Sequence, residues 1–122
     1  MQTAEGALQG MGVQLQVIPE PMLRERYFGA QLELQGDDHY PLVWAQDKQD
    51  PSYVPGGDGE SVAAVSRRLS ELMQRLDALY QDATILLVGH CDTLAILEAM
   101  VCETPLTAFR QYALKNCEFR RL

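Results

Sequence analysis

One apolar stripe, in the segment SVAAVSRRLSELMQRLDALYQ at residues 61–81, constrains the fold more than any other feature of the sequence. Its aliphatic side chains recur at alternating steps of three and four residues: Val62, Val65, Leu69, Leu72, Leu76 and Leu79. That period predicts an α-helix with a single apolar face, which must pack against another element. Ser61 suits the start of this helix, because a hydroxyl group there can accept from a free backbone N–H.

The segments around this helix predict an α/β domain. TILLVGH at 84–90 is short, apolar and β-branched at its start, which after a helix is typical of a buried parallel strand. DTLAILEAMV at 92–101 predicts a second, well-covered helix. Upstream we expect a helix over 2–12 and a short strand over 13–19, and downstream a last strand at 116–122. The alternation of helices and strands favours one α/β domain spanning the whole chain, residues 1–122.

Composition limits the classes of function. The chain has 122 residues, 47% hydrophobic and 22% charged, which is ordinary for a soluble globular protein. A net charge of -7 without a basic face argues against nucleic-acid binding. Three cysteines without metal-like spacing suit a reducing compartment. No signal-peptide pattern and no apolar run of about 18 residues is present, so we expect a cytoplasmic protein without membrane association.

Two residues are candidates for chemistry. His90 ends the predicted strand 84–90 just before a helix, where α/β proteins bind ligands and helix N-termini favour anions. The alternative is an ordinary hydrogen-bonded histidine at a strand end. Glu25 lies in LRERYFG, inside a stretch of about 40 residues, 20–59, without strong periodicity; such long loops are usually functional. The alternative for Glu25 is a solvated loop carboxylate.

Three motifs, in this order, resemble the histidine phosphatase superfamily, the phosphoglycerate-mutase-like proteins. They are LRERYFG at 23–29, GES at 59–61 opening a helix, and ILLVGH at 85–90 followed by a helix. The opening QTAEGAL and the closing LKNCEF are similar to further segments of that family, so the resemblance covers nearly the whole chain. It implies a three-layer α/β/α fold with a mostly parallel sheet, truncated at the N-terminus.

The resemblance also implies roles for individual residues. Glu25 takes the position of the proton donor to the leaving oxygen, and His90 that of the second histidine, which stabilises the phosphoryl group. Arg26 matches an arginine that contacts substrate in the mutases, and Arg24 is a further candidate for substrate binding; solvated loop charges are the alternative for both. Cys91 replaces a glycine that commonly follows the second histidine, so it either narrows the pocket or supplies a thiolate. The family chemistry needs no metal or other cofactor.

The family's nucleophile is a histidine in an Arg-His-Gly motif, and the sequence contains no such tripeptide. The other histidine, His39, lies in an acidic loop after the Glu25 motif, so we expect a surface residue there. Without the nucleophile we expect this chain to be inactive by itself. The missing first strand would expose the edge of the strand 84–90, which predicts a homo-oligomer, or a rearranged sheet, that covers this edge.

Three interpretations stay open. The first is an enzyme of phosphatase lineage, acting on a phosphorylated small molecule or a phosphoprotein. The second is a non-catalytic relative that keeps the anion pocket for binding. The third is an interaction module in which Glu25 and His90 are inherited and unused.

Overall fold

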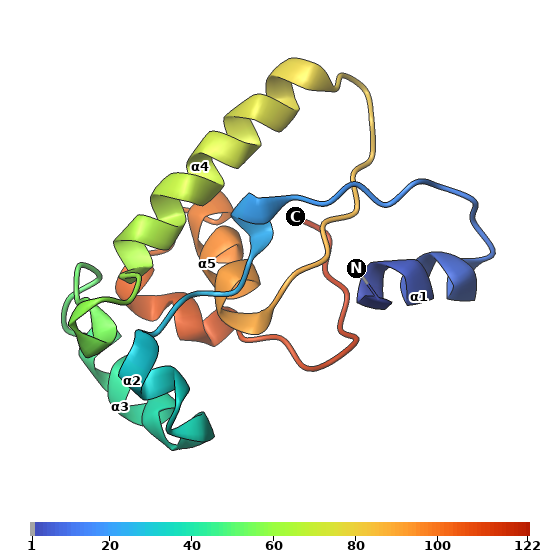
Figure 1. Ribbon diagram of the computed structural model, residues 1–122. Helices are drawn as coiled ribbons and strands as arrows, with labels where there is room; N and C mark the ends of the chain where they lie inside the picture. Colours follow the sequence, from blue (N-terminus) through green and yellow to red (C-terminus); the bar gives the residue numbers. More distant parts are fainter. Residues whose placement is uncertain (1) are drawn as a thin grey trace.

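The computed structural model describes residues 2–122 as helices joined by extended and irregular segments (Figure 1). Its α-helices are α1 (Gln2–Met11), α2 (Ala30–Glu33), α3 (Tyr40–Asp47), α4 (Val62–Leu79) and α5 (Cys91–Val101). Its 3₁₀ helices are η1 (Pro21–Leu23), η2 (Gly36–His39), η3 (Pro55–Gly57) and η4 (Leu106–Tyr112).

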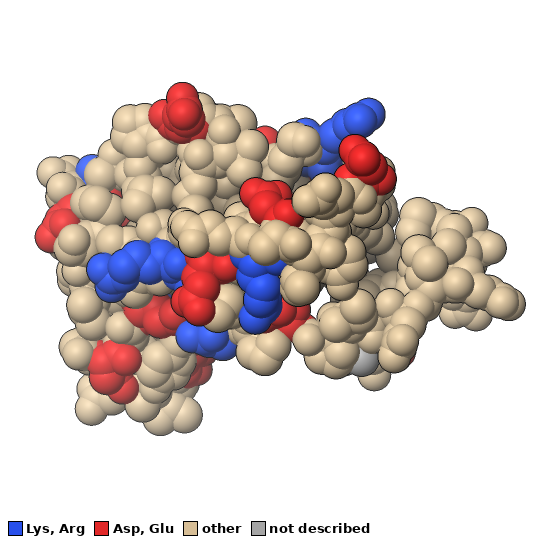
Figure 2. Space-filling model, turned by 90° about the horizontal axis from the view of Figure 1, so that it is seen from above, with Lys and Arg blue, Asp and Glu red and all other residues tan. Residues whose placement is uncertain are grey.

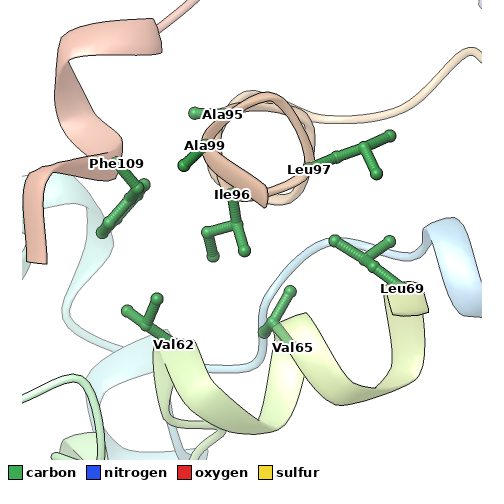
Figure 3. Close-up of a cluster of buried hydrophobic side chains, with 8 residues drawn as sticks. All are labelled: Val62, Val65, Leu69, Ala95, Ile96, Leu97, Ala99 and Phe109. Atoms are coloured by element: carbon green, nitrogen blue, oxygen red, sulfur yellow. The ribbon is translucent and has the colours of Figure 1, made fainter. Parts of the chain in front are cut away.

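The core lies where α4 packs against α5 and η4 (Figure 3). The predicted stripe of α4 supplies Val62, Val65 and Leu69, which point toward α5; Val62 and Val65 lie nearest Ile96, and Leu69 lies on the side of Leu97. Burying an aliphatic side chain of this size contributes about 1.5–3 kcal/mol, so this contact holds the two long helices together. The apolar stripe extends beyond the part of α4 that packs against the core. Leu79 is 67% exposed where the end of α4 projects from the core (Figure 1).

Three predicted helices are confirmed. The helix α4 begins after Ser61, whose Oγ accepts a hydrogen bond from the backbone N–H of Ala64 at 3.0 Å. The helix predicted over 92–101 is α5. The helix predicted over 2–12 is α1, and Gly12 follows it with a φ of +65°, a conformation that favours glycine. No described residue of α1 is buried, so the apolar side of that helix has no core partner.

The predicted three-layer α/β/α fold with a mostly parallel sheet is wrong for this structure. Residues 2–122 contain no β-strand, and the segments 13–19, 84–90 and 116–122 are extended or irregular chain. A strand exists only as part of a hydrogen-bonded ladder, and the backbone of 84–89 bonds to no neighbouring strand among the described residues. Ile85 and Leu86 are consequently exposed rather than buried.

The long stretch between residues 20 and 59 folds back on itself and carries the first candidate motif to the start of α4. Gly59 of the GES motif lies directly on this stretch, because a Cβ there would come within 2.7 Å of the Phe28 carbonyl carbon and 2.6 Å of the Pro55 oxygen. The Glu60 backbone N–H donates to the Tyr27 carbonyl. Close packing between 25–29 and 59–61 therefore requires glycine at this point.

Charged side chains of both signs lie next to one another on the face of the molecule that is seen from above (Figure 2). That face carries no continuous basic patch. Among residues 2–122, none of the helices combines the length and the apolar character needed to cross a bilayer.

Candidate active site

Glu25 is held against the first turn of α5. The hydroxyl of Thr93, a fully buried residue of that turn, lies 3.2 Å from Glu25 Oε1 and 2.9 Å from the carbonyl oxygen of Arg24. Glu25 Oε1 also accepts the backbone N–H of Arg26 at 2.8 Å. The fold thus brings together the LRER motif and the start of α5, which lie more than sixty residues apart in sequence.

Arg68 of α4 fixes the same motif from the other side. Its guanidinium donates to the carbonyl oxygens of Met22 and Arg24, and to both carboxylate oxygens of Glu60 at 3.0 and 3.2 Å. Burial alone would raise the pKa of Glu60, but the hydrogen bonds from Arg68 and from the Tyr27 backbone, with the nearby positive charges, outweigh it and lower the pKa. Glu60 therefore stays ionised and keeps the loop attached to α4.

Arg26 does not reach solvent. Its side chain is fully buried, and Nη1 and Nη2 donate to the two oxygens of Asp47 on α3 at 2.6 and 2.9 Å. The Nε group donates to the carbonyl oxygen of Glu60 at 2.8 Å. Arg26 therefore ties α3 to the start of α4, and its fork is filled by protein acceptors.

Asp92, in the first turn of α5, joins three side chains. Its carboxylate accepts from Trp44 Nε1 at 3.0 Å and from Arg110 Nη1 at 2.8 Å, and lies 3.8 Å from Nη1 of Arg26. The Arg110 guanidinium also lies over the Trp44 ring, 3.6 Å from its centroid. This buried carboxylate consequently connects α3, α5 and η4 in one network.

A cavity of about 210 Å³ opens beside this network. It is lined by acidic, basic, thiol and aromatic side chains: Glu25, Phe28, Tyr40, Trp44, Cys91, Asp92 and Arg110. The aromatic wall is ordered, because Tyr40 stacks on Trp44 with ring centroids 5.4 Å apart and meets Phe28 edge-on at 5.1 Å. Burial, followed by the nearby carboxylates of Asp37, Glu33, Glu25 and Asp92, raises the pKa of Tyr40, so its hydroxyl keeps its proton.

The residues predicted from sequence occupy different places around this cavity. Glu25 and Cys91 both line it, so the fold brings these two together. His90 is the exposed residue that precedes α5, and its ring makes no hydrogen bond to residues 2–122. Arg24 is exposed and pairs with Glu60 at 3.4 Å. The chemical roles assigned to these residues stay predictions.

The expectation for His39 is wrong. Its side chain is buried, with 4% of the residue exposed, rather than lying at the surface. The ring packs against Phe28 at 5.3 Å and Tyr40 at 4.3 Å between centroids. Neither ring nitrogen has a hydrogen-bond partner among the described residues. The helical turn η2 places the His39 ring against these aromatic side chains. The acidic residues around His39 in the sequence gave no indication of this burial.

Four further residues contribute to this site, and the sequence around one of them, Arg68, indicates that its side chain is buried. Arg68 falls between Val65 and Leu72 on the apolar stripe of α4, and a charged residue in such a position needs a buried partner. An acidic residue in the first turn of a helix, such as Asp92, is already explained by the helix dipole, so its sequence position does not indicate a buried partner. Arg110 and Asp47 gave no local signal, because their partners are distant in sequence.

The arrangement offers a carboxyl group, a half-exposed thiol and a fixed guanidinium at one small opening. A carboxyl group there can donate or accept a proton, and an arginine can bind an oxyanion. His, Cys, Asp and Glu side chains of residues 2–122 form no group of three or more that could hold a metal ion.

Comparison with known proteins identifies relatives. A sequence profile of the histidine phosphatase superfamily (branch 1) matches residues 1–122. The adenosylcobalamin/alpha-ribazole phosphatase of Salmonella typhimurium is 29% identical, over 93% of this chain and 57% of its own length.

Solved structures of phosphatases also match this chain. A mycobacterial glucosyl-3-phosphoglycerate phosphatase superimposes with a TM-score of 0.64 and 26% identity, over 87% of this chain and 56% of that one. The alpha-ribazole phosphatase of Shigella flexneri gives a TM-score of 0.62 and 24% identity, over 93% and 56%. The chain thus spans a little over half the length of these relatives.

Proposed function

The chain belongs to the histidine phosphatase superfamily, and on that premise we propose that its residues serve phosphomonoester hydrolysis or phosphoryl transfer. Glu25 is the general acid that protonates the leaving oxygen as the bond from phosphorus to oxygen breaks. His90 stabilises the negative charge on the phosphoryl oxygens. Such reactions depend mainly on positioning and on charge stabilisation, which a preorganised site supplies.

The observation that carries the proposal is the attachment of Glu25 to the first turn of α5. The Thr93 hydroxyl and the Arg26 backbone N–H both lie within hydrogen-bond distance of Glu25 Oε1, at 3.2 and 2.8 Å. The other carboxyl oxygen makes no hydrogen bond to the described residues, and Glu25 lines the cavity. A general acid must be both oriented and open to its substrate, and Glu25 combines these two properties.

Residues 1–122 offer no histidine for the nucleophilic role. The sequence holds two histidines and no Arg-His-Gly motif. His39 is enclosed by Phe28 and Tyr40, which leaves no room for in-line attack on phosphorus. The proposal therefore includes that residues 1–122 alone form no phosphohistidine and turn over no substrate.

The substrate class is a phosphorylated small molecule, with a phosphoprotein as the alternative. The relatives, phosphatases of alpha-ribazole compounds and of a glucosyl phosphoglycerate, support the first. A cavity of about 210 Å³ is also suited to a small group. We place the protein in the cytoplasm, where its three free cysteines would stay reduced.

A second candidate function is binding without catalysis. The lining of the cavity supports it, because its carboxylate, guanidinium and aromatic groups can recognise a phosphate ligand without a nucleophile. In this function Glu25 contributes to binding and transfers no proton.

The test starts from the genomic DNA upstream of the codon for Met1. If the frame encodes Arg-His-Gly, the longer protein should hydrolyse an aryl phosphate, and acid quenching should trap a phosphohistidine. Glu25→Gln should then lower kcat by about 100-fold or more, the usual contribution of a general acid. Glu71→Gln, on the exposed face of α4, is the matched control and should leave kcat unchanged.

Two results would contradict the catalytic proposal. One is a stop codon in frame directly upstream, which favours the binding function. The other is a longer protein with Arg-His-Gly whose kcat does not respond to Glu25→Gln. Turnover by residues 1–122 alone would contradict the statement that this chain lacks a nucleophile.

A further inference from the structure

Arg110 is held in one orientation by two different contacts. Its guanidinium stacks over the Trp44 ring at 3.6 Å, and its Nη1 donates to Asp92 Oδ1 at 2.8 Å. Asp92 is itself fixed by the hydrogen bond from Trp44 Nε1 at 3.0 Å. These three side chains come from η4, α3 and α5, so the position of Arg110 is set by the packing of all three elements. A guanidinium fixed in this way loses little conformational entropy when it binds a ligand.

Part of the hydrogen-bonding capacity of Arg110 is unused. A guanidinium carries five N–H donors. Nη1 serves Asp92 and approaches Cys91 Sγ at 3.7 Å, whereas Nε and Nη2 donate to no acceptor among residues 2–122. The side chain is 25% exposed and lines the cavity, so these donors lie where a ligand can reach them.

Arg26 provides the internal comparison. It is the other arginine beside Asp92, yet its side chain is 0% exposed and its donors are filled by Asp47 and the Glu60 carbonyl. The Asp92 carboxylate lies 3.8 Å from the guanidinium group of Arg26 and 2.8 Å from that of Arg110. The two arginines therefore share this carboxylate as an ion-pair partner. Arg26 is therefore structural, and Arg110 is the arginine of this network that has donors to offer.

The walls next to Arg110 are aromatic. The Trp44 ring contacts both the Arg110 guanidinium and the stacked Tyr40 ring, so Trp44 supports these two side chains. Tyr40 and Phe28 line the same cavity as Arg110 and Glu25. The cavity of about 210 Å³ is large enough for one ring, since cavities of about 150 Å³ already accept benzene.

We propose that Arg110 is a substrate-recognition residue, which binds an oxyanion of a ligand whose adjoining ring packs against Phe28 and Tyr40. The inference rests on the proposed function, because it takes this cavity as the site of a phosphomonoester. It deepens that function by naming the substrate class: a compact phosphomonoester with a flat ring next to its acidic group. The oxyanion is either the phosphoryl group itself or a second acidic group on the leaving portion.

The experiment measures ligand binding by residues 1–122, so it needs no turnover. Isothermal titration calorimetry is carried out with phenyl phosphate, with inorganic phosphate and with benzoate. Quenching or a shift of the emission of Trp44, the only tryptophan in the sequence, locates the bound ligand at this cavity. We expect phenyl phosphate to bind more tightly than inorganic phosphate, because only phenyl phosphate has a ring that can pack against Phe28 and Tyr40.

Two variants of Arg110 and one control decide the role of the guanidinium. Arg110→Gln should weaken phenyl phosphate binding by about tenfold or more, the usual effect of losing hydrogen bonds to a charged group. Arg110→Lys keeps the charge but loses the planar fork, and should weaken binding as well. Arg67→Gln, an exposed arginine on α4 outside the cavity, should bind like the original chain. Urea unfolding of each variant verifies that it is folded at the assay temperature.

Benzoate distinguishes the two sources of the oxyanion. Binding of benzoate that depends on Arg110 places the recognised acid on the leaving portion, and binding of phenyl phosphate alone places it on the phosphoryl group. The inference is overturned if folded Arg110→Gln binds both phenyl phosphate and benzoate as tightly as the original chain, or if the original chain binds neither of them at millimolar concentration. Equal affinities for inorganic phosphate and phenyl phosphate would contradict the proposed packing of the ligand ring against Phe28 and Tyr40. A longer protein without Glu25-dependent turnover would contradict the proposed function and leave these binding results unchanged.

Discussion

Arg26 and Asp47 form a two-point ion pair in which both side chains are buried, with nitrogen–oxygen distances of 2.6 and 2.9 Å. The pair joins the loop that carries Glu25 to α3, which carries the aromatic wall of the cavity. Removal of one partner would leave the other charge buried without compensation, and that is more costly than the loss of an exposed ion pair.

Asp47→Ala should therefore lower the free energy of unfolding by about 3–5 kcal/mol. The measurement is urea unfolding followed by far-UV circular dichroism. Asp38→Ala, an exposed aspartate in η2, is the control and should change stability by less than about 0.5 kcal/mol. Similar stabilities for the two variants would show that the pair contributes no more than a surface charge.

Gly59→Ala should destabilise the protein by about 1–3 kcal/mol. The added Cβ would lie 2.6 and 2.7 Å from backbone atoms of Pro55 and Phe28, which cannot move aside as a flexible side chain would. Gly6→Ala, in α1 with no atom within 4 Å, should have the opposite sign and stabilise the helix slightly. Thermal unfolding of the two variants compares them directly, and a neutral Gly59→Ala would contradict the close packing of the GES motif.

His39→Leu should raise the free energy of unfolding by about 1 kcal/mol. The His39 ring is buried among aromatic side chains, and neither of its nitrogens has a partner among residues 2–122, so an apolar side chain avoids their desolvation. Urea unfolding at pH 7 measures the change. A loss of more than about 1 kcal/mol would mean that the ring nitrogens are satisfied, for example by water.

The lowered pKa of Glu60 predicts how stability responds to acid. A carboxylate whose pKa is lower in the folded state contributes stability above its ordinary pKa, and this contribution is lost as the pH falls through the lowered value. Glu60→Gln should therefore be less stable than the original chain at pH 7, and the difference should shrink below about pH 4.5. Urea unfolding at several pH values tests this. A difference that is the same at pH 7 and at about pH 3.5 would contradict the role of the charge.

We predict self-association from exposed apolar side chains. Ile85 and Leu86 are exposed in the extended segment 84–90, whose backbone between 84 and 89 has no strand partner among the described residues. Light scattering after size-exclusion chromatography should give a dimer or larger species at micromolar concentration. Leu86→Lys should shift it toward monomer, and Leu34→Lys, at an 88% exposed residue directly after α2, should not. A monomer for the original chain would contradict this prediction.

The helices could be predicted from the sequence because their signals are local. The stripe from Val62 to Leu72 and the serine cap together give the start and the buried face of α4. The apolar run after Cys91 likewise gives α5. The strands could not be settled in the same way, since TILLVGH has the composition of a buried strand but a ladder requires a neighbour that hydrogen-bonds to it.

The candidate site was predicted in part for the same reason. Its motifs gave Glu25 and Cys91, which the fold brings to one cavity. Arg110 and Asp47 were not found, because an arginine or an aspartate has the same local sequence whether its side chain is buried, paired or solvated. His39 was misplaced for that reason too, since its acidic neighbours are exposed while its own ring is covered.

The sequence by itself determined the positions of the long helices, the caps and glycines that bound them, and the motifs that place the chain among the histidine phosphatases. Only the tertiary structure decided which charged side chains are buried and which are accessible to a ligand. Arg26 is buried in an ion pair with Asp47, whereas Arg110, beside Trp44, has N–H donors without a partner among residues 2–122. The physical reason is that periodicity and capping act over a few residues, while the burial and pairing of a charge depend on side chains that folding brings from distant parts of the chain.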